Sequence, residues 1–211
     1  MKRIGITGGI GSGKSFIATI IERMGYPVYY SDVRSKELTN AHPIIRKGLI
    51  DLVGENVYFG GELDKKVLST AIFSNDELRL KVNQLIHPIV RQDFEDWANS
   101  QKSDLIFNEA AILFETGAYR NFDATILVYA PEDLRLKRVL KRDIITKEEV
   151  LARMNNQLKD DEKRKMTSLQ ILNDDESPIL IQIEDMIERL KILCIPFAKS
   201  LQSIRSGKTR L

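Results

Sequence analysis

Two kinds of hydrophobic pattern alternate along the chain, and each predicts one kind of element. Continuous apolar runs, typical of strands buried in a parallel sheet, lie at residues 2–7, 27–30, 104–109 and 124–129, with a weaker run at 169–172. Helical patterns separate these runs. Because strands that alternate with helices form parallel sheets through right-handed crossovers, the sequence predicts an α/β fold with a five-stranded parallel sheet.

The region between the second and third predicted strands carries only helical signals. Apolar residues recur with helical spacing at 43–53 and 65–73, and a longer helical pattern from residue 75 is interrupted at His87-Pro88. We therefore expect a helical insertion without strands at 33–100.

A glycine-rich segment separates the first strand from the first helix. Residues 8–15 read Gly-Gly-Ile-Gly-Ser-Gly-Lys-Ser, which is a P-loop in its proper strand-to-helix context. Its backbone N–H groups would cradle phosphate oxygens, Lys14 would reach the β- and γ-phosphates, and the Ser15 hydroxyl would ligate Mg²⁺. A glycine-rich turn without a ligand would not require Lys-Ser at the helix start. The expected nucleotide-binding residues are Gly11, Ser12, Gly13, Lys14, Ser15 and, through its backbone, Phe16.

A P-loop fits a small-molecule kinase or a nucleotide-driven switch or motor. The chain has no Asn-Lys-x-Asp guanine-binding motif, and its length argues against a motor with its own track. A kinase needs an acceptor-binding insertion, for which 33–100 is the candidate, and a general base. We expect Asp32, just past the second strand, to face Lys14 across the phosphate cleft and to accept the acceptor's hydroxyl proton. The alternative is that Asp32 caps a helix beginning at Val33.

Basic residues are concentrated in the segment that follows the fourth strand. Arg135, Arg138 and Arg142 have the spacing of one helical face, and a capping box at 146–149 begins another helix. This segment is either a solvated charged helix or a lid, at 138–160, that clamps the transferring phosphate.

Overall composition sets only broad limits. The chain has 211 residues, a net charge of +2 and 29% charged residues of both signs, so no global field favours nucleic acid or a membrane surface. The single cysteine, Cys194, excludes an intramolecular disulfide and fits a core position in a cytoplasmic protein. No apolar run approaches the length of a membrane span, no obligate protein partner is implied, and the tail from Arg205 is expected to fray.

Six ordered motifs together resemble the dephospho-coenzyme A (dephospho-CoA) kinase family over nearly the whole chain. They are Thr7 to Ser15, Asp32 after the second strand, Leu63 to Phe73, His87-Pro88, Leu113-Phe114-Glu115, and Arg138 with Arg142-Asp143; Gln157 and Asn173 match further recurrent positions. The family differs at places where this chain has Tyr30 for an acidic residue, Lys65 for Arg and Ala111 for Pro, and also where it has Phe16 for Thr and Glu109 for an apolar residue.

The resemblance implies a P-loop kinase fold of the nucleoside-monophosphate-kinase type, forming one domain. It also implies transfer of the γ-phosphoryl group of ATP, with Mg²⁺, to the ribose 3′-hydroxyl of dephospho-CoA, the last step of CoA synthesis. Arg138 and Arg142 would act in catalysis with Lys14 and Asp32. Arg142 and Asn173 would bind ATP, and Asp32, Lys65, His87 and Glu115 would bind the acceptor.

Several alternatives stay open. Glu109, which ends the third strand, resembles an outer-shell magnesium ligand but would serve equally as a local ion-pair partner. His87 is a substrate contact or a structural residue, and Trp97 a packing residue or a stacking platform. Another small-metabolite kinase and a non-catalytic nucleotide-binding regulator are the competing functions.

Overall fold

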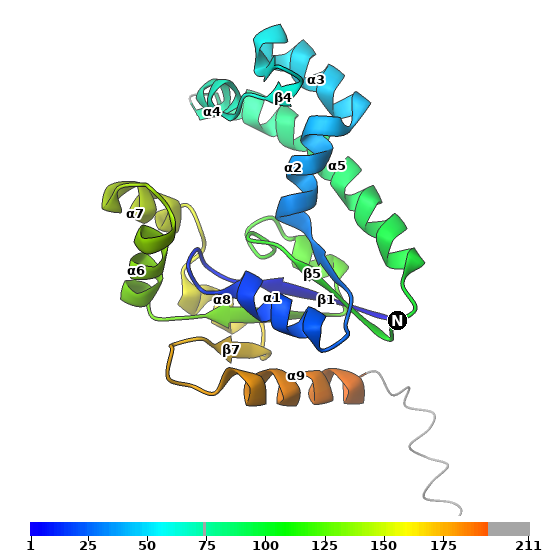
Figure 1. The fold of residues 1–211 in the computed structure, drawn as a ribbon, viewed down its shortest axis with the longest axis vertical. Helices are drawn as coiled ribbons and strands as arrows, with labels where there is room; N and C mark the ends of the chain where they lie inside the picture. Colours follow the sequence, from blue (N-terminus) through cyan, green and yellow to red (C-terminus); the bar gives the residue numbers. More distant parts are fainter. Residues whose placement is uncertain (74, 194–211) are drawn as a thin grey trace, which may run out of the picture. The chain divides into compact units, whose positions relative to one another are not determined.

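The computed structural model describes residues 1–73 and 75–193 (Figure 1). Cys194 and the tail from Arg205 lie outside the described residues, so their predicted roles are not tested.

The first half of the chain contains β1 (Lys2–Thr7), α1 (Lys14–Arg23), β2 (Val28–Tyr30), α2 (Ser31–Ala41), α3 (Pro43–Val53), the 3-10 helix η1 (Glu55–Val57), β3 (Tyr58–Phe59), β4 (Glu62–Leu63), α4 (Lys65–Phe73) and α5 (Asp76–Ser100). The second half contains β5 (Leu105–Glu109), η2 (Ala118–Asn121), β6 (Ala124–Tyr129), α6 (Glu132–Arg142), α7 (Lys147–Asn155), α8 (Asp160–Met166), β7 (Gln170–Leu172) and α9 (Ile179–Leu193).

The predicted five-stranded parallel sheet is confirmed, with strand order β2-β5-β1-β6-β7. In its centre Ile4 of β1 is in register with Ala124 of β6, and Leu127 of β6 with Gln170 of β7. All five residues of β5 are buried, both its apolar run Leu105–Phe107 and the polar residues Asn108 and Glu109 that end it. Because β1, β6 and β7 run in parallel, the loops that follow them meet at one edge of the sheet.

The chain divides into two compact units. Among the described residues, the P-loop unit comprises Met1–Val28, Ser103–Phe107 and those from Ala111 to 193, and the helical unit comprises Tyr29–Lys102 and Asn108–Ala110. In the P-loop unit, α1 packs on β1 and β6, α8 packs on β6, and α9 packs on β7 (Figure 1). None of the helices in the described ranges is both long and apolar enough to cross a membrane.

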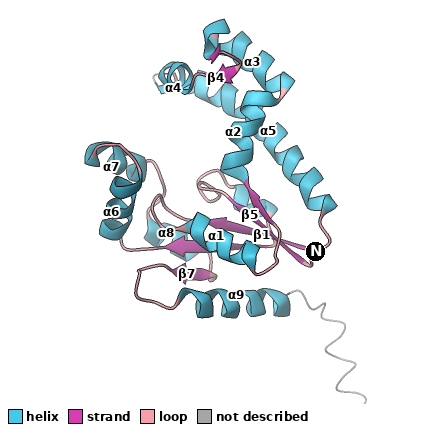
Figure 2. Cartoon of the chain, viewed as in Figure 1, coloured by secondary structure: helices cyan, strands magenta, loops and turns pink. Residues whose placement is uncertain are grey.

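The helical unit is built from α2, α3, α4 and α5 around buried Ile45, Leu49, Val57 and Val82. The expectation that this region contains no strands was wrong, because β3 and β4 form a short antiparallel hairpin (Figure 2). Gly60 and Gly61, with φ of 57° and 90°, make its two-residue turn.

The predicted interruption at His87-Pro88 was also wrong, since α5 continues through Pro88. Proline removes the hydrogen bond to the carbonyl four residues earlier, here that of Gln84. Both Pro88 and Gln84 are exposed, so water can bond to this carbonyl and the helix continues.

Inside the helical unit, aromatic packing joins Tyr29 of β2 to α5, and the Asp93 carboxylate of α5 also binds Arg34 of α2. The ring of Tyr29 lies 5.1 Å from that of Phe94 and 5.3 Å from that of Trp97, which favours the packing role for Trp97. The Tyr29 hydroxyl donates to Asp93 at 2.6 Å, and Arg34 donates to both oxygens of the same carboxylate. Burial is the larger cause that raises the pKa of Tyr29, and its hydrogen bond to Asp93 is the second. The hydrogen bond from Arg34 lowers the pKa of Asp93.

Candidate active site

The P-loop occupies residues 8–13, between the end of β1 and the first residue of α1. Gly11 and Gly13 adopt φ of 79° and 87°, which residues with a Cβ rarely adopt. A Cβ on Gly11 would also lie 2.5 Å from the carbonyl oxygen of Arg135, and one on Gly13 would overlap the amide of Asn173. These two positions therefore require glycine both for backbone conformation and for space.

Three successive carbonyl groups of the loop accept hydrogen bonds from side chains of later elements. Arg135 Nη1 donates to the oxygen of Ile10 at 3.5 Å, and Arg138 Nη1 to that of Gly11 at 3.4 Å. Asn173 Nδ2 donates to the oxygen of Ser12 at 2.8 Å. In a trans peptide the C=O and the next N–H point in opposite directions, so these contacts turn the N–H groups of residues 11–13 away from the three side chains; of these, the N–H of Ser12 donates to the carbonyl of Gly9 at 3.0 Å.

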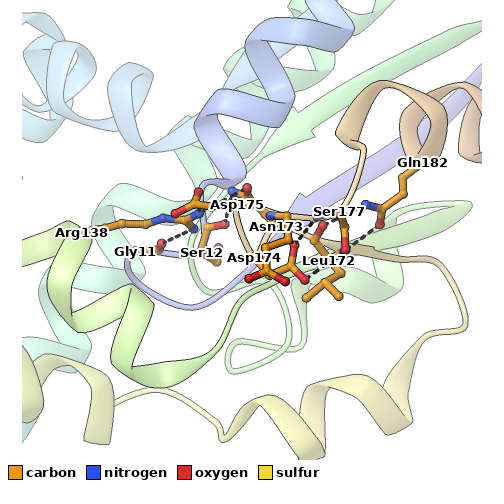
Figure 3. A network of polar contacts seen from close by, with 10 residues as sticks. Gly11, Ser12, Arg138, Leu172, Asn173, Asp174, Asp175, Ser177 and Gln182 are labelled. Carbon is orange, nitrogen blue, oxygen red and sulfur yellow. Dashed lines mark hydrogen bonds and ion pairs between the residues drawn. The ribbon is translucent and has the colours of Figure 1, made fainter.

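Arg138 and Asn173 belong to one network (Figure 3). Arg138 Nη2 lies 3.4 Å from Asn173 Oδ1, and the same nitrogen bonds to the carboxylate of Asp175, which has a positive φ of 68°. The Asp174 side chain holds the turn by accepting from the N–H of Ser177 at 2.7 Å. The structure thus joins α6 and the loop after β7 to the P-loop, and the close neighbours found here include the predicted residues Arg138 and Asn173.

Two features of the P-loop suit an anionic ligand. The Ser12 hydroxyl is buried without a hydrogen-bond partner among the described residues. No acidic side chain lies in the first turn of α1, whose N-terminus carries positive potential. No cluster of three or more His, Cys, Asp or Glu side chains that could hold a metal exists in residues 1–73 and 75–193.

Arg142 lies apart from this network. At the end of α6 its guanidinium makes two hydrogen bonds with the neighbouring Asp143, Nε to Oδ1 at 2.7 Å and Nη2 to Oδ2 at 2.9 Å. This contact raises the pKa of Arg142 and lowers that of Asp143. The Arg142 side chain remains 65% exposed, so it is accessible to a ligand.

Glu115 has partners inside the P-loop unit that sequence reasoning did not find. Its Oε1 lies 2.7 Å from Nζ of Lys163 and accepts the N–H of Leu158 at 3.2 Å. Lys163, in α8, is fully buried. Lys163 and Arg135 were missed as structural partners because, in a charge-rich segment, sequence alone does not distinguish buried cations from solvated ones. A single lysine surrounded in sequence by apolar residues would have indicated a buried cation.

We expect Lys163→Met to destabilise the protein by about 3–5 kcal/mol, because removal of one member of a buried ion pair leaves the other charge uncompensated. Urea unfolding measures this change, with Lys165→Met on the exposed side of the same helix as the control. A loss below 1 kcal/mol would show that the Lys163–Glu115 contact contributes little to the folded state.

The predicted acceptor-side residues Asp32, Lys65 and His87 belong to the helical unit. Asp32 is the second residue of α2, which begins at Ser31, so it is not the residue that precedes the helix. Its carboxylate is exposed, as are Lys65, the first residue of α4, and His87 in α5. Although His87 is exposed to solvent, partial desolvation of its ring and then the charge of Arg91 lower its pKa, which favours a neutral imidazole. Glu109 ends β5 as predicted, and its side chain is 3% exposed. This position is compatible with both predicted roles, an outer-shell magnesium ligand and a local ion-pair partner.

Comparisons with known proteins agree with this architecture. A model of the dephospho-CoA kinase family matches residues 2–178. Dephospho-CoA kinase from Bacteroides fragilis is 43% identical over 197 residues, covering 91% of this chain and 96% of that protein. The structure of TT1252 from Thermus thermophilus has a TM-score of 0.80 at 32% identity, covering 92% of this chain and 98% of that one. Dephospho-CoA kinase from Campylobacter jejuni, with a TM-score of 0.63 at 22% identity over 91% and 96% of the two chains, supports the fold alone. By the extent and identity of these matches, the chain belongs to the dephospho-CoA kinase family.

Proposed function

We propose that the protein transfers the γ-phosphoryl group of ATP to the ribose 3′-hydroxyl of dephospho-CoA, giving CoA and ADP. Membership of the family supports the acceptor and the reaction. The observation that carries the proposal is the P-loop, whose carbonyls at residues 10–12 are all held by side chains. This arrangement keeps the N–H groups of Gly11 and Gly13 turned away from those side chains, so they could donate to a phosphate without reorganisation of the loop.

Each side chain then has a proposed role. Lys14 neutralises the β- and γ-phosphates, and Phe16 contributes its backbone N–H. Ser15 would hold Mg²⁺, which would supply positive charge against the charge that develops during transfer. Arg138, held near Gly11 and Asn173, supplies a permanently charged planar donor.

On the acceptor side, we propose Asp32 as the base that accepts the 3′-hydroxyl proton. Lys65, His87 and Glu115 are proposed to contact dephospho-CoA. Glu115 Oε1 already binds Lys163, whereas its buried Oε2 has no hydrogen-bond partner within the described part of the chain. That oxygen is the atom through which Glu115 would act. We further propose that 33–100 binds the acceptor and that 138–160 forms the lid of a single kinase domain in the cytoplasm.

An ADP-release assay tests the function directly. The purified protein is mixed with ATP, Mg²⁺ and one acceptor at a time: dephospho-CoA, AMP, adenosine or shikimate. We expect turnover with dephospho-CoA and a product that carries phosphate on the ribose 3′-oxygen. Equal turnover with another acceptor would assign the chain to a different kinase activity, and ATP binding without turnover on any acceptor would favour a regulator.

We expect Arg142→Lys and Arg138→Lys each to lower kcat about 10-fold or more, because lysine cannot make a bidentate, permanently charged contact with phosphate. Lys141→Arg, on the exposed surface of α6, is the control for the effect of changing a cation there. Steady-state kinetics at saturating ATP measures the change. Parent-like kinetics in both Arg variants would restore the reading of α6 as a solvated charged helix.

A further inference from the structure

The P-loop has one side-chain contact of a different kind from the carbonyl contacts. The N–H of Ile10 donates to Oε1 of Gln157 at 2.9 Å. The carbonyl of the same peptide, that of Gly9, accepts the N–H of Ser12 at 3.0 Å. The peptide between residues 9 and 10 is therefore held at both ends, its N–H by Gln157 and its carbonyl by the N–H of Ser12.

Side chains hold Ile10 at both of its polar groups. Gln157 accepts its N–H, and Arg135 Nη1 donates to its oxygen at 3.5 Å. A peptide plane can reverse by concerted rotation of the two backbone dihedrals beside it, and flanking glycines make such rotation easy. Gly9 and Gly11 flank Ile10 in the sequence. The contacts to Ile10 thus act at the place where the loop is least restrained by its own residues.

Gln157 is itself held firmly, although it lies in a loop between α7 and α8. The N–H of the next residue, Leu158, donates to Glu115. Glu115 pairs with fully buried Lys163, and Asp160 lies 3.4 Å from Arg135. These contacts anchor the segment that follows Gln157 to the P-loop unit at two points, so the amide stays near Ile10 with little entropic cost.

An amide is suited to this place for a chemical reason. Its oxygen accepts the Ile10 N–H without adding charge next to a site for a triphosphate. A carboxylate of the same size would keep the acceptor but would repel the nucleotide, and an aliphatic side chain would leave the N–H without this partner.

We propose that Gln157 is a positioning residue that fixes the peptide between Gly9 and Ile10, and thereby keeps the P-loop amides directed at the nucleotide phosphates. The proposal rests on the proposed ATP-binding function of the loop and adds a residue from the lid side to it. Gln157 acts through the Ile10 backbone and need not touch the nucleotide.

Two variants separate this role from a merely structural one. Gln157→Leu removes the acceptor, and we expect kcat/KM for ATP to fall about 10- to 100-fold, the range that follows from leaving the Ile10 N–H without a partner. The melting temperature should change by less than about 3 °C, and KM for dephospho-CoA by less than about twofold. Gln157→Glu keeps the acceptor, so kcat should stay near that of the parent. Its KM for ATP should rise several-fold, and higher salt should reduce that rise.

Asn155→Leu serves as the control, because it removes an exposed amide two residues away. Parent-like ATP kinetics in Gln157→Leu would overturn the proposal. So would a loss that follows a fall in melting temperature and affects both substrates alike, since that pattern marks a structural role.

Calorimetry with ADP, without any acceptor, separates this inference from the proposed function. If the parent binds ADP but phosphorylates no dephospho-CoA, the proposed reaction fails, and ADP affinity still tests Gln157. We then expect Gln157→Leu to bind ADP about 10-fold or more weakly than the parent and the Asn155→Leu control. Equal ADP affinity in all three proteins would overturn the positioning role.

Discussion

Lys14→Ala is expected to lose phosphoryl transfer while the protein remains folded. Lys14 begins α1 directly after the P-loop, and its ammonium is the proposed counter-charge for the β- and γ-phosphates. Loss of one preorganised group that stabilises transition-state charge typically lowers kcat by about 10²–10³. The loop should keep its shape, because Gly11 and Gly13 and the side chains that hold the loop carbonyls are unchanged.

Single-turnover kinetics with dephospho-CoA measures this loss, and thermal unfolding checks the fold. Lys137→Ala is the matched control, since it removes an exposed lysine from α6 without changing the P-loop. If Lys14→Ala turned over at a rate close to that of the control, Lys14 would have no part in transfer. If its melting temperature fell by more than about 5 °C, the residue would have a structural role as well.

Sequence was most informative where one physical requirement determines both the residue type and the conformation. Buried parallel strands need continuous apolar residues, and all five were predicted near their observed bounds. The P-loop glycines are required by positive φ and by close packing against Arg135 and Asn173. The capping box at Thr146 and Glu149 is present in full and begins α7 as expected.

The wrong predictions fall where local signals are weak or depend on exposure. The β3–β4 hairpin has two residues in each strand, too few for a period-two pattern, and only Gly60-Gly61 signalled its turn. The effect of Pro88 depends on whether the carbonyl of Gln84 faces water, which a helical pattern alone does not reveal.

Contacts between distant segments were beyond sequence reasoning. Charges were expected to serve ligands or solvent, yet Lys163 is buried against Glu115 and Arg135 against Asp160. The order of elements along the chain does not specify such pairs, because both partners lie in segments whose composition suits the surface. The arginine spacing in α6 predicted the helix, but not that Arg135 and Arg138 bind P-loop carbonyls while Arg142 binds Asp143.

Asp32→Asn is expected to lower kcat by about 10²–10⁴, the usual cost of removing a general base, while ATP and dephospho-CoA still bind. Asparagine keeps the size and polarity of the side chain but cannot accept the hydroxyl proton at neutral pH. The structural cost should be small. Asp32 lies exposed in the first turn of α2, and its side chain makes no hydrogen bond within the described residues. The substitution therefore removes only a favourable interaction with the helix dipole, which is worth about 0.3–1 kcal/mol.

Asp51→Asn in α3 is the matched control, because it removes an exposed carboxylate from the same helical unit. Rapid-quench kinetics gives the rate of transfer, calorimetry gives the affinities, and urea unfolding gives the stability of both variants. If Asp32 is the general base, only Asp32→Asn should transfer phosphate slowly, and its affinities and stability should be close to those of Asp51→Asn. If its kcat stays within a few-fold of the parent while its stability falls, Asp32 stabilises α2 instead, and a different group must accept the proton of the 3′-hydroxyl.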